Sequence, residues 1–79
     1  MRLVIEIPED TAATLNFMPE DLPEQFRIAA AIKWYELGRV SQGRAAEIAG
    51  LSRSAFIELL VEYGVSPFQE SATDLRQIP

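Results

Sequence analysis

The chain has 79 residues, with 12 acidic and 7 basic side chains, no cysteine, no histidine and a formal net charge of −5. This length predicts one small domain, and the composition excludes disulfides, thiolate chemistry and a histidine base. Apolar runs fall short of a membrane span, and the N-terminus has no signal-peptide pattern. We therefore expect a folded cytoplasmic protein with no membrane association and no small-molecule cofactor, in which homodimer formation adds to the stability of a small core.

Charge is unevenly distributed along the chain. Residues 27–53 carry five basic and two acidic side chains, whereas the segments on either side are both net acidic. A basic central third indicates a surface for an anionic partner, or charges scattered over a solvated surface. Either way, the pattern bears on association rather than on fold.

The first eight residues have the pattern of a β-strand. Leu3, Ile5 and Ile7 alternate with the intervening side chains, and Pro8 ends the run. A lone strand leaves its backbone groups unpaired, and the other candidate, 65–68, contains Pro67, which lacks a donor. We therefore expect residues 1–8 to form a two-stranded ribbon across a dimer.

A helical domain is expected over residues 9–64. One or two helical turns over 8–17 lead through a proline-containing turn at 18–25 to a strong helix over 23–38. That helix is apolar over more than half its girth, which predicts burial against its own domain and against a partner chain. The expected dimer interface comprises Leu3, Ile5, Ile7, Phe26 and Trp34.

Two short helices joined by a tight turn are predicted at 42–63, the helix-turn-helix order. Ser41 and Ser52 are typical N-caps, and Gly50 supplies the positive φ that the turn needs. Ala46 is the small side chain needed where the two helices cross closely, and Ala45 and Ala49 also point inward. The structural positions are Ala46, Gly50, Leu51, Phe56 and Leu59. The fold class expected is mainly α: a three-to-four-helix domain with a short N-terminal β-strand.

The second helix of this unit would present its first residues to a DNA groove. Arg53 suits bidentate contact with guanine, and serine hydroxyls suit phosphates, whereas Glu58 repels phosphate. Ile57 and Val61 are apolar, so this face alternatively packs under the C-terminal segment or a partner chain. The candidate DNA-binding residues are Arg44, Ser52, Arg53, Ser54, Ile57 and Glu58, with Lys33 and Arg39 as further phosphate contacts.

Residues 65–79 change in character, with scattered acids and isolated apolar side chains. Two interpretations remain open: a frayed terminus, or a partner-binding segment that orders on docking. The anchors in the second case are Phe68, Leu75 and Ile78, and Thr73 would cap one helical turn over 74–78.

Catalytic and metal sites are not expected. Glu58 and Glu62 lie four residues apart, but no third ligand is placed by spacing, and surface carboxylates at this separation are usually just solvated. The chain has no glycine-rich phosphate loop and no nucleophile elbow. We therefore expect a protein that is not an enzyme and binds no metal.

The stretch "IAAAIKWYELGRVSQGRAAEIAGLSRSAFIELLVEYGVSP" (28–67), preceded by a short strand and "PED", resembles uncharacterised protein family 0175. These small prokaryotic proteins are often regarded as antitoxins of toxin–antitoxin pairs. The matching residues, besides the "GVSP" exit, are Tyr35, Glu36, Gly38, Ser41, Gly43, Ala45, Ala46, Ala49, Gly50, Ser52, Phe56 and Gly64.

The resemblance implies a helix-turn-helix fold with an N-terminal strand and a DNA-binding, autoregulating antitoxin. Its tail would cover a toxin, commonly a nuclease of the PIN-domain type. The present tail departs from the family by being short and only mildly acidic. The alternative is a protein-interaction module that uses the same scaffold for dimer or partner contacts without binding DNA.

Overall fold

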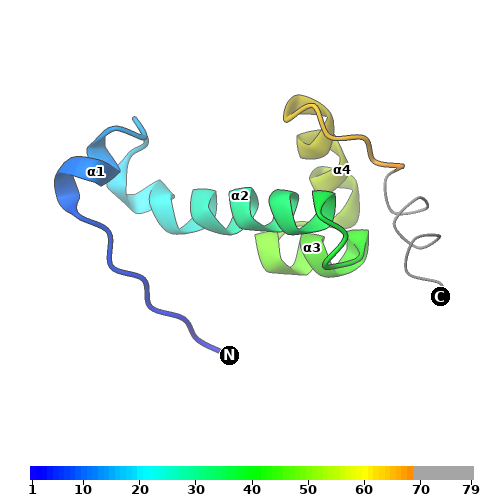
Figure 1. Cartoon of the computed structure of the whole chain (residues 1–79), viewed down its shortest axis with the longest axis horizontal. Helices are drawn as coiled ribbons and strands as arrows, with labels where there is room; N and C mark the ends of the chain where they lie inside the picture. Colours follow the sequence, from blue (N-terminus) through cyan, green and yellow to red (C-terminus); the bar gives the residue numbers. More distant parts are fainter. Residues whose placement is uncertain (69–79) are drawn as a thin grey trace.

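A computed structural model describes residues 1–68 of the protein. Helix α1 (Glu9–Ala13) and a 3-10 turn, η1 (Pro19–Asp21), precede the long helix α2 (Leu22–Glu36), which is followed by α3 (Gln42–Ala49) and α4 (Arg53–Glu62). α1 lies at one end of α2, and α3 and α4 lie at the other (Figure 1). The mainly helical fold that the sequence predicts is confirmed.

One face of α2 forms one side of the hydrophobic core. Ile28, Ala31, Ile32 and Tyr35 follow the three-and-four spacing of a helical face, and all four are buried. Pro23 occupies the first turn, where its missing N–H costs nothing. Positive φ at Gly38 ends the helix, so that the chain turns back and α3 packs against α2.

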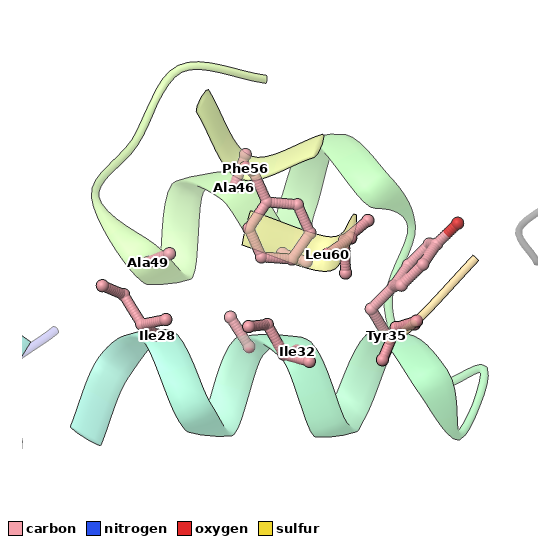
Figure 2. Close-up of a cluster of buried hydrophobic side chains, with 10 residues drawn as sticks. Ile28, Ile32, Tyr35, Ala46, Ala49, Phe56 and Leu60 are labelled. Atoms are coloured by element: carbon pink, nitrogen blue, oxygen red, sulfur yellow. The ribbon is translucent and has the colours of Figure 1, made fainter. Parts of the chain in front are cut away.

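Side chains from α2, α3 and α4 converge on one hydrophobic cluster (Figure 2). Phe56 and Tyr35 meet edge to face, with ring centroids 6.2 Å apart and planes at 84°, a favourable aromatic arrangement. The cluster comprises Ile28, Ala31, Ile32, Tyr35, Ala45, Ala46, Ala49, Phe56, Leu60 and Val65. Four of these ten residues are alanines, which allow the helix backbones to approach closely.

The buried face of α4 differs by one position from the prediction. Leu60 is fully buried, whereas Leu59, expected to point inward, is partly buried at the edge of the cluster. The reason lies after the helix: Gly64 turns the chain, the Val65 N–H donates to the Leu60 carbonyl at 2.8 Å, and Val65 joins the core. Leu60 and Val65 are the pair of residues that this type of helix end brings together.

Residues 1–8 form no strand in the described chain, and the expected strand is absent from the single copy. They extend from α1 as a segment without regular secondary structure (Figure 1), and every side chain except that of partly buried Ile7 is exposed. The physical reason is the missing partner. Residues 65–68 are also not a strand, because the Pro67 carbonyl accepts from Tyr35 and Gln42 instead.

The predicted C-terminal segment, residues 65–79, lies partly outside the described residues. Phe68 is 79% exposed, and its N–H donates to the Ser66 hydroxyl at 3.1 Å. Leu75, Ile78 and the helical turn expected over 74–78 lie outside the described residues. Their predicted role therefore stays a prediction.

Candidate nucleic-acid interface

The turn between α3 and α4 is three residues long and has the backbone predicted from sequence. Gly50 has φ 74°, which glycine adopts without penalty. The Gly50 N–H donates to the Glu47 carbonyl at 3.1 Å and the Leu51 N–H to the Ala46 carbonyl at 3.0 Å. This pair of bonds is the Schellman motif, and it sends the chain directly into the start of α4.

Arg27 locks the same turn from outside, a role that the sequence analysis missed. Its Nε donates to the Ile48 carbonyl at 2.8 Å, and its Nη2 lies 3.4 Å from the Glu47 carbonyl. A Cβ added at Gly50 would lie 3.1 Å from Nη2, so the guanidinium covers the glycine. A cation at the C-terminal end of α3 also opposes the negative end of its dipole. The turn is thereby fixed to α2.

The start of α4 is capped and exposed. The Ser52 hydroxyl accepts from the Ala55 N–H at 3.2 Å, which confirms the predicted cap, and lies 3.4 Å from the Ser54 hydroxyl. Both serines are exposed. Backbone N–H groups and hydroxyls at a helix N-terminus favour an anion such as a backbone phosphate.

Arg53 occupies the first position of α4 and is exposed, as a groove-reading residue must be. Its Nε donates to Oε1 of Gln42 at 2.7 Å, so the base of the side chain is anchored to α3. The guanidinium has five N–H donors in a fixed plane. A bidentate contact with a base edge would use the Nη1 and Nη2 atoms, which carry four of these donors.

The rest of the outward face of α4 is mixed. Glu58 is exposed, as expected, and its charge opposes phosphate. Ile57 is partly buried, so it offers less surface to a groove than the sequence analysis assumed. Val61 is 64% exposed. Residues 65–68 therefore do not cover Val61, and its packing under the rest of the C-terminal segment or under a partner chain stays a prediction.

Two of the expected phosphate contacts are paired with acids of their own helices. Arg44 lies 3.1 Å from Glu47, and Lys33 lies 3.1 Å from Glu36. Such exposed pairs contribute about 0–1 kcal/mol, and phosphate can compete for them. With Arg27 also engaged at the turn, the attraction for DNA is weaker than the charge of residues 27–53 suggests.

The residues predicted for the dimer interface lie on surfaces that one copy leaves uncovered. Successive residues of a helix turn by about 100°, which places Phe26 and Leu37 opposite the core face of α2 and Trp34 at its side, and all three are exposed. Leu3 and Ile5 are also exposed. Together with Ile7, Phe17, Leu22 and Phe26 they line a groove between the N-terminal segment and the start of α2.

Other kinds of site find little support in residues 1–68. No group of three acidic side chains is placed to hold a metal ion there. Nor is any helix in this part of the chain both long and apolar enough to cross a membrane.

Comparison with known proteins gives a family but not an activity. The family model described as "Uncharacterised protein family (UPF0175)" matches residues 1–78. A "UPF0175 protein" of Aeropyrum pernix strain K1 is 41% identical over 76 residues, which cover 96% of this chain and 80% of that protein. No solved structure matches. With nearly the whole chain matched and a relative this similar, the protein belongs to the uncharacterised protein family UPF0175.

Proposed function

We propose that the protein is a DNA-binding homodimer that acts in the cytoplasm as the antitoxin of a toxin–antitoxin pair. The observation that carries the DNA-binding part is the start of α4. It is exposed, capped by Ser52, and held in place by a turn that Arg27 ties to α2. A rigid, outward helix N-terminus with an arginine in its first turn has the chemistry of a groove-reading helix.

The roles of the side chains follow from their chemistry. Arg53 would contact a guanine edge, which accepts two N–H donors. Ser52 and Ser54 would hold a phosphate at the helix N-terminus, and Arg44 a flanking phosphate. Glu58 would disfavour close phosphates on its side and accept from a cytosine amine.

A single copy has too few positive groups for a useful DNA site, so the proposal includes a dimer. The N-terminal segments of two copies would pair as an antiparallel ribbon. This pairing is supported by exposed apolar side chains within residues 1–21, which are Leu3, Val4, Ile5, Phe17 and Met18. A two-stranded ribbon alone is marginal. Its Leu3–Ile5 face therefore needs an apolar surface, which the outer face of α2 around Phe26 and Trp34 supplies.

The test is a titration of a labelled duplex from directly upstream of the coding sequence, followed by fluorescence anisotropy at several salt concentrations. We expect binding at low salt, with a slope of log affinity against log salt between about −3 and −6 for a dimer with this number of cations. Absence of binding at the lowest salt would contradict the proposal. Binding without salt dependence would do so as well.

A protein-interaction role is the second candidate, and the exposure of Val61 and Phe68 favours it. The partner would be the toxin, of the PIN-domain nuclease type that the family resemblance suggests, bound through the C-terminal segment. In an antitoxin both roles coexist. If only this one operates, the helix-turn-helix unit serves as a scaffold for dimer or partner contacts without DNA.

Truncation after Phe68 tests the partner role. Val65 is part of the core and the Pro67 carbonyl accepts from Tyr35 and Gln42, so the cut must not fall earlier. We expect co-purification with the product of the neighbouring gene to be lost, while the melting temperature of the truncated protein stays within a few degrees of that of the full chain. An intact complex after truncation would show that the segment beyond residue 68 is not the anchor.

A further inference from the structure

Gln42 is the one buried polar side chain in the described part of the chain, and both ends of its amide are bonded. It is 4% exposed at the first position of α3. Its Oε1 accepts from Nε of Arg53 at 2.7 Å, and its Nε2 donates to the Pro67 carbonyl at 3.0 Å. A buried polar group that lost either bond would carry a desolvation penalty.

The chemistry of the two partners requires an amide between them. The Nε of arginine only donates and a backbone carbonyl only accepts. The connecting side chain must therefore accept at one end and donate at the other. A carboxylate has only acceptor oxygens, so it could not donate to the Pro67 carbonyl. A methionine of similar length would form a hydrogen bond with neither partner.

The chain of bonds extends to the core. The Pro67 carbonyl also accepts from the Tyr35 hydroxyl at 3.1 Å, and Tyr35 is buried. The carbonyl thus has two donors and is held at a fixed place beside α2 and α3. Gln42 transmits that fixed position to Arg53, at the start of α4.

We propose that Gln42 is a positioning residue, which orders the Arg53 side chain for its contact and makes that order depend on the backbone at Pro67. The expected effect on DNA affinity rests on the proposed DNA-binding role, whereas the ordering of Arg53 by Gln42 does not. An arginine ordered before binding loses less rotamer entropy on contact than a mobile one. Displacing the backbone around residue 67 would break the bond between Gln42 and the Pro67 carbonyl and weaken the ordering of Arg53.

The variant that tests this is Gln42→Met, which keeps the length and removes both hydrogen bonds. The first readout is the ¹⁵N–¹H signal of Arg53 Nε, assigned by its loss in Arg53→Lys. In the wild type we expect a dispersed signal with slow solvent exchange. In Gln42→Met we expect it to move to the position of the exposed arginines and to exchange rapidly.

The second readout is the affinity for the upstream duplex, which should fall by about tenfold in Gln42→Met, the loss expected when a bidentate contact is weakened. Tyr35→Phe removes the other donor to the Pro67 carbonyl and keeps Gln42, so its Arg53 signal should lie between those of the wild type and Gln42→Met. Ile32→Val is the control for loss of stability alone. It should keep the Arg53 signal and bind DNA within about twofold of the wild type.

Two results would overturn the proposal: an Arg53 signal unchanged in Gln42→Met, or an equal loss of DNA affinity in Gln42→Met and Ile32→Val. If Gln42→Met fails to fold, Gln42→Leu provides the second variant, which also removes both hydrogen bonds and should likewise lose the wild-type Arg53 signal. A wild type without DNA affinity would contradict the proposed function alone, since the Arg53 signal still decides the role of Gln42.

Discussion

Phe56→Ala is expected to leave about half of the protein or more unfolded at room temperature. Phe56 is fully buried at the centre of the cluster, with its ring edge to face with Tyr35. Truncations of this kind cost about 3–5 kcal/mol, and a core of this size supplies roughly 3–5 kcal/mol in all. The loss therefore equals the whole stability of one copy. Far-ultraviolet circular dichroism against temperature and urea measures it.

Phe68→Ala is the matched control, because it deletes the same atoms at an exposed position. We expect its free energy of unfolding to stay within about 0.5 kcal/mol of the wild type. A Phe56→Ala protein that melts cooperatively near the wild-type temperature would show that the core does not depend on this ring. That result would contradict the packing described for α2, α3 and α4.

Ile5→Asp, combined with Leu3→Asp, is expected to convert the dimer to a monomer. In the proposed ribbon these side chains share one face and pack on the outer face of α2, so two carboxylates there would each need to be desolvated. DNA affinity should then fall by about 100-fold or more, since two half-sites are no longer bound together. Sedimentation velocity at micromolar concentration and the duplex titration measure the two effects.

Val4→Asp separates the ribbon from a general effect of charge. Val4 is also exposed in the single copy, but the period of a strand points it to the other face. We expect this variant to remain dimeric. Equal dissociation by Val4→Asp would exclude a ribbon with the predicted register, and a wild type that sediments only as a monomer would exclude the dimer.

Features with local causes were predictable from the sequence. The caps at Ser41 and Ser52 bond to N–H groups three residues away, and the turn at Gly50 depends on carbonyls within five residues. Composition and spacing suffice for such contacts. The start of α4, which carries the candidate site, was therefore placed correctly.

Features that depend on packing were missed or misplaced. Arg27 reaches carbonyls 20 and 21 residues along the chain, and Gln42 joins partners 11 and 25 residues away. Nothing in the local pattern marks either residue. Leu59 and Leu60 are equally apolar neighbours, so only the return of Val65 onto α4 decides which of them is buried.

The N-terminal strand illustrates a different limit. Its alternation is a property of the sequence, but a strand exists only with a partner for its backbone groups. Residues 1–8 of one copy have none in the described chain, and they form no strand. The alternation in residues 1–8 therefore predicts strand pairing with a partner rather than a strand in the single chain.

The central claim is that the capped start of α4 reads DNA through Arg53. Its most direct test is to titrate wild type, Arg53→Ala and Arg44→Ala against the upstream duplex and a scrambled duplex of equal composition. We predict that Arg53→Ala binds about 10- to 100-fold more weakly and loses the preference between duplexes, whereas Arg44→Ala weakens binding to both alike. Equal binding by wild type and Arg53→Ala, or no binding by wild type at low salt, would contradict it.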